Sequence, residues 1–370
     1  MQSRWNRFFG LLSAVIAITT LCLSSQVPAT GQQISGGYIQ HNLVSNVPNT
    51  AITTDPNLKN AWGIAYGPTG PFWISDAGTG VSTLYNGSAA KLPLTVTIPP
   101  PEGSSDTASP TGIVFNGTQD FVVSQDGRSG PAIFIFATED GTLSGWNPNV
   151  NGTAAILVPN SIPGAVYKGL ALVSGPSGNR LFATDFSNNA VRIFDGGFNL
   201  IGSFTDPLLP SGFAPFGIAN IQGLLYVTFA LQEPPDNEDD QAGPGNGFVD
   251  VFSPDGAMIR RFASQGTLNS PWGLALAGDF GDFSNALLVG NFGDGTINAF
   301  DFTTGDFLGQ LTDTRGLPVF IDGLWALTFG NGGQGGSPRV LYFTAGPNDE
   351  NDGLFGDLQP AQSNGGIINP

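Results

Sequence analysis

The chain has 370 residues, of which 53 are glycine and 28 are proline, and its formal net charge at pH 7 is −17. Its hydrophobic fraction of 40% and its 28 phenylalanines exclude an intrinsically disordered chain, although only 11% of the residues are charged. The excess of negative charge opposes binding to nucleic acid and to anionic lipid, so cations are the better-matched partners.

The first thirty residues have the pattern of a secretory signal peptide. Two arginines precede an uncharged apolar run at residues 8–23, and small residues follow around Ala29. A retained membrane anchor is the alternative, although the run is short for a membrane span. We therefore expect residues 1–30 to be cleaved on export, which leaves a secreted, extracellular or periplasmic chain without a transmembrane segment. Cleavage would also remove Cys22, the only cysteine, so the mature chain would contain no disulfide.

After this segment, one short motif occurs six times. Its clearest copy is SPWGLALAG at residues 270–278. The glycines of the six copies are Gly63, Gly112, Gly169, Gly217, Gly273 and Gly323, which are separated by 49, 57, 48, 56 and 50 residues. A period of this length indicates a repeat architecture.

Each copy of the motif begins a unit of short, strand-like segments. A second apolar run follows, as in FWISD (72–76), FVVSQD (121–126) and LFATD (181–185). A third run comes next, such as AVRIF (190–194), and then a dipeptide such as Asp195-Gly196, which tolerates the positive φ angles of a tight hairpin. The length and residue types of these runs favour strands over helices. Each unit is therefore predicted to be a four-stranded antiparallel sheet.

Six such units predict an all-β, six-bladed β-propeller, because one such sheet cannot bury both of its faces alone. The sixth unit lacks a fourth strand of its own. We expect the apolar segment YIQHNLVSN (38–46) to pair with the last blade and close the ring, which would remove an open sheet edge. The predicted domain spans residues 38–358 and is a monomer, with a flexible tail at residues 359–370.

The repeated motif is predicted to be the innermost strand of each blade. Its glycine would let neighbouring backbones approach closely near the axis. The aromatic residues beside it, including Trp62, Trp272 and Trp325, are expected to pack between blades. The sixth copy departs from the pattern, because Trp325 follows Gly323 by two residues.

Two of the units carry a resemblance to a known class of repeat. SPWGLALAG with LLVGNFGDGTINAFD, and YKGLALVSG with LFATDFSNNAVRIFD, resemble the repeats of six-bladed NHL-type propellers. From HNLVSN to DGLFGDL, the chain also resembles a family of secreted bacterial propeller proteins of unassigned function, many of which end in a membrane-sorting tail. The chain ends at GGIINP without an apolar helix, so attachment to a membrane by such a tail is not expected.

The residues that end the second strands are predicted to face one rim of the propeller. Candidates for ligand binding there are Asp76, Asp126, Asp185 and Asn291, since rim loops on a rigid scaffold commonly carry function. Asp76, Asp185 and Asn291 come from alternate units, so their oxygens could hold Ca2+ on the axis. The alternative is that each side chain closes its own turn by accepting backbone N–H groups.

A second candidate is the insertion LQEPPDNEDDQAGPGNG (231–247) in the fourth unit. Asp236, Glu238 and Asp240 lie close together in it and could bind Ca2+, although their spacing is not that of an EF-hand loop. The alternative is a solvated, mobile loop. Its position places it on the same rim.

Residues for covalent catalysis are scarce. His41 is the only histidine, and it lies in the predicted closing strand at the outer edge of a blade, which argues against a Ser-His-Asp triad. Among the three lysines, only Lys168, beside Gly169, lies on an axial strand.

The sequence therefore predicts a secreted binding or interaction module that presents acidic rim loops to a protein, a glycan or a cation. The alternative is a calcium-dependent hydrolase or lactonase with a metal on the propeller axis. This alternative rests on analogy with other six-bladed propellers, and a fold alone does not decide function.

Overall fold

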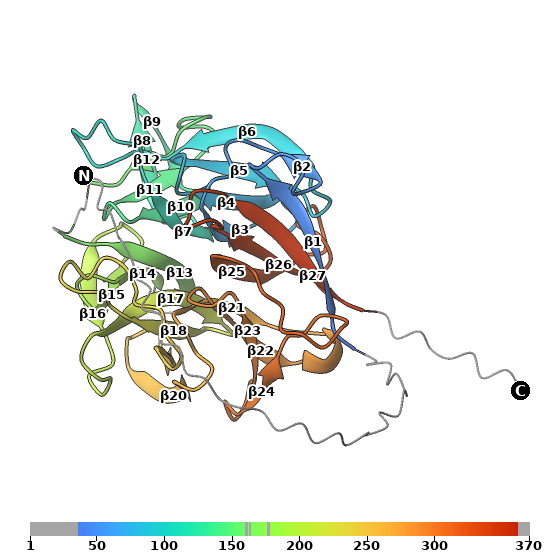
Figure 1. Cartoon of the computed structure of the whole chain (residues 1–370). Helices are drawn as coiled ribbons and strands as arrows, with labels where there is room; N and C mark the ends of the chain where they lie inside the picture. Colours follow the sequence, from blue (N-terminus) through green and yellow to red (C-terminus); the bar gives the residue numbers. More distant parts are fainter. Residues whose placement is uncertain (1–35, 160–161, 163, 176–177, 362–370) are drawn as a thin grey trace, which may run out of the picture. The chain divides into compact units, whose positions relative to one another are not determined.

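The computed structural model describes residues 36–361, apart from residues 160, 161, 163, 176 and 177. These residues form an all-β, six-bladed propeller of four-stranded antiparallel blades, as the repeats predict (Figure 1). The described part of the chain contains one short 3-10 helix, Gly281–Phe283, and no helix long and apolar enough to cross a membrane. The predicted signal peptide and residues 362–370 of the predicted tail lie outside the described residues.

Four blades consist of four consecutive strands in the predicted order. Blade 1 contains β3 (Ala61–Ala65), β4 (Phe72–Asp76), β5 (Val81–Tyr85) and β6 (Lys91–Thr97). Blade 3 contains β13 (Tyr167–Gly175), β14 (Gly178–Asp185), β15 (Ala190–Phe194) and β16 (Leu200–Phe204). Blade 4 contains β17 (Phe213–Ile221), β18 (Leu224–Leu231), β19 (Gly247–Phe252) and β20 (Met258–Ser264). Blade 5 contains β21 (Pro271–Leu276), β22 (Ala286–Asn291), β23 (Ile297–Asp301) and β24 (Phe307–Gln310).

Blade 2 corrects one prediction. Its strands are β7 (Pro110–Phe115), β10 (Phe134–Thr138), β11 (Leu143–Trp146) and β12 (Ile156–Leu157), while β8 (Val122–Gln125) and β9 (Arg128–Pro131) form a separate hairpin. The prediction that FVVSQD is the second strand is therefore wrong. A second strand is covered on both faces by neighbouring blades, so it needs residues that can be buried at every position. All five residues of β10 are buried, whereas Ser124 and Gln125 of β8 are exposed.

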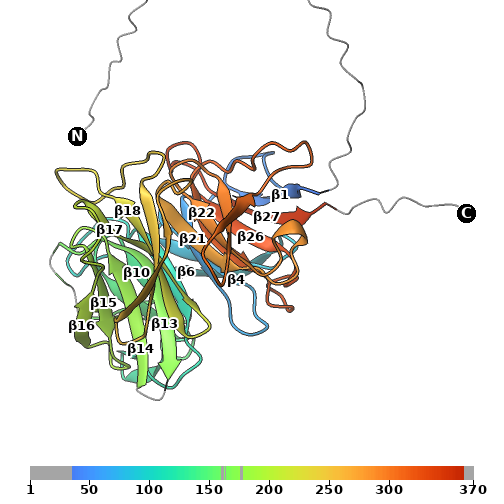
Figure 2. The ribbon, with the colours of Figure 1, turned by 90° about the horizontal axis from the view of Figure 1, so that it is seen from below.

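The N-terminal strand closes the ring, as predicted. Blade 6 contains β25 (Leu324–Phe329), β26 (Leu341–Ala345), β27 (Leu354–Pro360) and β1 (Tyr38–Ser45), and β2 (Thr53–Thr54) pairs with the outer side of β1. In the antiparallel pairing of β1 with β27, Tyr38 lies opposite Pro360 and Ser45 opposite Leu354. The two strands lie side by side in both views (Figures 1 and 2). The strand β27 extends two residues beyond the predicted domain limit at residue 358.

The innermost strands contact one another in the order β3, β7, β13, β17, β21 and β25, and β25 contacts β3 again. In all six, the pairing with the second strand shifts register at the same point, beside the repeated motif. The glycine there allows the close approach that the sequence predicts. A Cβ atom on Gly217 would lie 2.2 Å from the carbonyl oxygen of Trp272, and one on Gly63 would lie 2.4 Å from that of Thr111.

In blade 6 the prediction that Gly323 is the motif glycine is wrong. Ala326 takes the place of the motif glycine, because its N–H donates to Thr344 Oγ1 at 3.1 Å, as the N–H of Gly169 donates to Thr184 Oγ1 at 2.7 Å. Gly323 lies before the strand with a φ of 64°. Trp325 thus lies directly before the motif position, as Trp62 and Trp272 do, and the sixth copy has the same spacing as the others with alanine in place of glycine.

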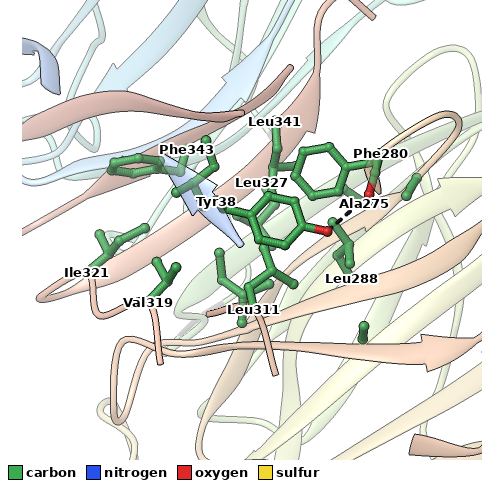
Figure 3. Packing of buried hydrophobic residues seen from close by; sticks show 14 of the residues in the cluster. Tyr38, Ala275, Phe280, Leu288, Leu311, Val319, Ile321, Leu327, Leu341 and Phe343 are labelled. Atoms are coloured by element: carbon green, nitrogen blue, oxygen red, sulfur yellow. Dashed lines mark hydrogen bonds between the residues drawn. The ribbon is translucent and has the colours of Figure 1, made fainter. Parts of the chain in front are cut away.

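Apolar layers fill the space between neighbouring blades. Between blades 5 and 6, Tyr38 packs with Phe280, Leu288 and Leu341, as Figure 3 shows. The Tyr38 ring stacks on Phe280 with 4.6 Å between ring centroids, and its hydroxyl donates to the Phe280 carbonyl oxygen at 3.0 Å. The closing strand therefore contributes a buried side chain to the core as well as backbone hydrogen bonds.

Candidate functional site

Six side chains surround the axis where the innermost strands begin, one from each blade. They are Trp62, Thr111, Lys168, Phe216, Trp272 and Trp325, and we call this group the hub. We call the end of the propeller on which the hub lies the hub face. The loops that enter each innermost strand and those that follow each second strand lie on this face, because the strands of each blade are antiparallel.

The hub residues fill the axis. Trp62 stacks on Trp325 with 3.5 Å between ring centroids, and both rings contact Trp272 edge-on at 6.0 and 5.8 Å. Phe216 of blade 4 reaches Trp325 of blade 6 at 5.9 Å, and Lys168 of blade 3 reaches Trp62 of blade 1 at 5.2 Å. Since residues of non-adjacent blades touch, the aromatic side chains form a packed plug across the axis rather than packing only between neighbouring blades.

Lys168 is the one charged member of the hub. Only 2% of the residue is exposed, its ammonium forms an ion pair with Glu139, and it lies 3.6 Å from Asp239 Oδ1. Burial alone would lower the pKa of Lys168, but the neighbouring charges of Glu139, Asp239 and Asp240 and the hydrogen bond to Glu139 outweigh it, so the pKa is raised. The side chain is therefore an ammonium ion at neutral pH and not an amine nucleophile.

A further carboxylate is linked to the hub from blade 6. Glu350 Oε2 accepts a hydrogen bond from Asn60 Nδ2 at 2.5 Å, and Asn60 Oδ1 accepts one from Trp325 Nε1 at 3.0 Å. Burial, followed by the negative charge of Glu139, raises the pKa of Glu350 to about 7. A large fraction of this carboxyl group is thus protonated at neutral pH.

A groove lies beside Lys168 on the hub face, and we call it the acidic groove. Its ionisable side chains are Glu139 and Asp140 from the β10–β11 loop and Glu238 and Asp239 from the blade 4 insertion; Gly164, Ala165 and Val166 complete its wall. The only cation in contact with it, among the described residues, is Lys168, whose charge is balanced by Glu139. The groove therefore keeps an excess of negative charge toward solvent.

The predicted insertion folds against the hub and carries Asp239 to Lys168. The N–H of Glu233 donates to the Asp239 carbonyl oxygen at 2.8 Å, and Gln232 Nε2 donates to the carbonyl oxygen of Phe186 at 2.7 Å. Of the three carboxylates predicted as a calcium loop, Asp236 and Glu238 are exposed and Asp240 is half-buried, and burial raises the pKa of Asp240.

The three candidates predicted for the axis are each bonded within their own blade or the loop that enters it. Asp76 is fully buried and its Oδ2 accepts from Thr83 Oγ1 at 2.7 Å; burial raises the pKa of Asp76 well above its ordinary value. Asp185 Oδ2 accepts from Arg192 Nε at 2.8 Å. Asn291 Nδ2 donates to the Thr267 carbonyl oxygen at 2.8 Å. Each of the three side chains thus forms hydrogen bonds within its own blade or the loop that enters that blade, and not with the other two.

Two other predicted residues lie away from the hub. Asp126 lies in the exposed turn of the β8–β9 hairpin with a φ of 51°, not at the end of a blade strand. His41 lies on the outer strand of blade 6, as predicted, where Nδ1 is 2.8 Å from Asp357 Oδ1. Within residues 36–361, apart from the gaps, no three Asp, Glu, His or Cys side chains are placed to hold a metal ion.

Sequence reasoning missed Glu139 as a member of the site. If residues 121–126 were the second strand of blade 2, as predicted, Glu139 and Asp140 would follow the third strand and lie on the opposite face. The signal was present, because the fully apolar run FIFA is followed directly by Thr138, Glu139 and Asp140. With that run as the second strand, the two carboxylates fall on the hub face.

The architecture and the hub define the chain as a six-bladed propeller whose axis is closed at one face. No protein-family model matches it. Two proteins of Acanthamoeba polyphaga mimivirus, both described as uncharacterised, are 34% identical to it over 333 and 332 residues. These alignments cover 85% of this chain and 78% and 84% of the viral proteins. The chain belongs to the same protein family as these two viral proteins.

Solved structures share the fold at low sequence identity. A catalytically inactive virginiamycin B lyase from Staphylococcus aureus with quinupristin aligns with a TM-score of 0.51 and 14% identity, over 88% of this chain and 99% of the lyase. A gluconolactonase from Xanthomonas campestris aligns with a TM-score of 0.50 and 15% identity, over 82% of this chain and 87% of the lactonase. At this identity the likeness shows the propeller fold alone.

Proposed function

We propose that this protein is a secreted binding module whose acidic groove takes a positively charged segment of a partner protein. The observation that carries this proposal is the composition of the groove: four carboxylates from two loops line it, and the one adjacent cation among the described residues, Lys168, is buried and paired with Glu139. A lysine- or arginine-rich segment would balance the negative charge of these carboxylates. Export is part of the proposal and rests on the signal-peptide pattern of residues 1–30.

The hub favours binding over catalysis at this face. Packed aromatic rings close the axis, so a substrate has no path into the centre of the ring from the hub face. The Glu139 and Asp239 carboxylates near the axis already have a cationic partner, the ammonium group of Lys168. A calcium ion beside Glu139 and Asp239 would lie within a few ångströms of this ammonium, and like charges at that distance repel strongly.

Binding of this kind is expected to depend strongly on salt. Exposed ion pairs contribute about 0.2–1 kcal/mol each, so affinity must come from several pairs together. The Debye length falls from about 14 Å near 50 mM salt to about 6 Å near 300 mM salt, so added salt screens these pairs. The complementary charges also speed association with the partner.

A titration with deca-lysine as the probe tests the proposal. We expect saturable binding by isothermal titration calorimetry in about 50 mM salt and a loss of affinity of about tenfold or more in 300 mM salt. The double variant Glu238→Gln/Asp239→Asn removes two groove charges and should lose most of the binding. The control Asp282→Asn/Asp306→Asn removes two exposed charges from loops on the opposite face and should bind as the wild type does.

Two results would contradict the proposal. One is the absence of binding in low salt. The other is an equal loss of affinity in both double variants, which would show that deca-lysine responds to the net charge of the chain and not to the groove.

A further inference from the structure

A cavity lies on the axis at the opposite face, where the innermost strands end. All six blades contribute to it: its walls include Ile64, Phe115, Leu172, Ile218, Leu274 and Thr328, from β3, β7, β13, β17, β21 and β25 in that order. Its volume is about 320 Å3, which lies within the range of small-molecule sites. It is separate from the acidic groove, which lies on the hub face.

The cavity is closed at its inner end and open at its outer end. Trp272 and Ala326, which line its inner end, are buried, and the stacked rings of the hub lie beyond them. Ile64, Leu172 and Thr328 lie one to three residues beyond the motif position of their strands and are half-buried. A ligand would therefore enter from the opposite face and stop at the hub.

The lining is uncharged in a strongly acidic protein. The chain has 29 acidic and 12 basic residues, yet none of the described residues that line the cavity is Asp, Glu, Lys, Arg or His. Aromatic side chains lie along its depth, with Tyr66 and Phe115 near the opening and Trp272 at the inner end. Such walls favour flat, uncharged molecules and exclude charged ones, because a charge would lose its hydration without gaining a partner.

Two polar side chains of the cavity, Tyr66 and Asn220, already have partners. The Tyr66 hydroxyl donates to the Phe329 carbonyl oxygen at 2.7 Å. Asn220 Nδ2 donates to the Leu172 carbonyl oxygen at 2.8 Å, and Asn220 Oδ1 accepts from the N–H of Gly223 at 3.0 Å. These two side chains do not need a polar ligand to complete their hydrogen bonds. Trp272 Nε1, by contrast, is buried without a hydrogen-bond partner among the described residues.

We propose that this cavity binds an uncharged, aromatic small molecule. The uncharged aromatic walls and the closed inner end favour such a ligand. The site is independent of the partner binding proposed for the acidic groove. The protein would then carry two sites at opposite ends of its axis, one for a cationic segment and one for an apolar molecule, separated by the packed hub.

The test uses N-phenyl-1-naphthylamine, an uncharged probe whose fluorescence rises in apolar surroundings. We expect saturable binding of one probe per chain. The matched probe 1-anilinonaphthalene-8-sulfonate adds a negative charge to nearly the same ring system, and we expect it to bind at least about tenfold more weakly.

Two variants locate the probe. Leu172→Trp fills the cavity from its wall and should abolish binding, whereas Leu308→Trp adds the same ring to an outer strand, where Leu308 is 51% exposed, and should leave binding unchanged. Circular dichroism melts check that both variants fold; if Leu172→Trp does not, Ile218→Phe places a smaller ring in the same cavity. The proposal is overturned if the wild type shows no saturable binding, if both probes bind equally, or if a folded cavity variant binds as the wild type does. Deca-lysine affinity in the folded cavity variant should equal that of the wild type, so the failure of one site does not imply the failure of the other.

Discussion

Replacement of the buried hub cation should destabilise the protein by a predictable amount. Lys168→Met keeps an apolar stem of similar length against Trp62 but removes the charge that balances Glu139 and Asp239. Breaking a fully buried ion pair costs about 3–5 kcal/mol, and breaking an exposed one costs less than about 1 kcal/mol. Here the lysine side chain is 3% exposed, but those of Glu139 and Asp239 are 29% and 79% exposed, so water partly solvates the carboxylates after the change. We therefore expect a loss of about 2 kcal/mol.

Urea denaturation followed by tryptophan fluorescence measures this loss, since three of the hub residues are tryptophans. The midpoint should fall while the slope m stays constant, and the melting temperature should fall by about 3 °C, because the entropy of unfolding is large for a domain of this size. Glu139→Gln alone should also destabilise the protein, because it leaves Lys168 buried with one fewer carboxylate. The double variant should lose less than the sum of the two single losses, with a coupling energy of about 1–2 kcal/mol.

A Lys168→Met protein within about 0.5 kcal/mol of the wild type would contradict the stabilising role of the buried ammonium. So would additive losses in the double variant, which would mean that the two side chains do not stabilise each other.

Three further predictions follow from single features of the structure. The pKa of Glu350 is raised to about 7 from an ordinary value of 4.5, so the folded state loses stability as pH rises through this window. The melting temperature of Glu350→Gln should therefore rise relative to that of the wild type between about pH 5 and pH 8. A difference in melting temperature that does not change with pH would contradict the raised pKa. Gly217→Ala places a Cβ 2.2 Å from the Trp272 carbonyl oxygen and should cost about 3 kcal/mol in urea denaturation, whereas Gly278→Ala, with no atom within 4 Å, should cost less than about 1 kcal/mol. Equal costs would show that the close approach is not needed. Melting with EDTA and with excess calcium should give the same midpoint, and a clear drop in EDTA would favour a metal-dependent activity over the binding module.

The architecture could be predicted because its signals are local and repeated. The motif glycines report a steric demand that blades 1 to 5 make in the same place, as the contact between Gly217 and Trp272 shows. Ring closure could be predicted because the last unit lacks a strand that the first segment supplies. The prediction for blade 2 is wrong because the apolar run at residues 121–126 has the composition of a strand, and it differs from β10 only in that its faces are not both buried.

The candidate site was predicted less well than the fold. Lys168 could be placed at the centre because it stands directly before a motif glycine. Its partners could not, because Glu139 and Asp239 come from two other blades and are 29 and 71 residues away in the sequence. The spacing of residues along the sequence does not predict contacts among three blades. The side chains meet only because the ring brings their loops together at the axis. The acidic insertion was placed on the correct rim, but its fold against the hub depends on contacts such as that of Gln232 with Phe186.

Hydrogen–deuterium exchange with bound deca-lysine tests most directly whether the hub face is the binding surface. Protection should appear in the peptides that contain residues 139–142, 164–166 and 238–240, which line or flank the acidic groove, and it should be absent from the turns that precede the fourth strands on the opposite face. Protection confined to those turns, or spread evenly over the surface, would contradict the account.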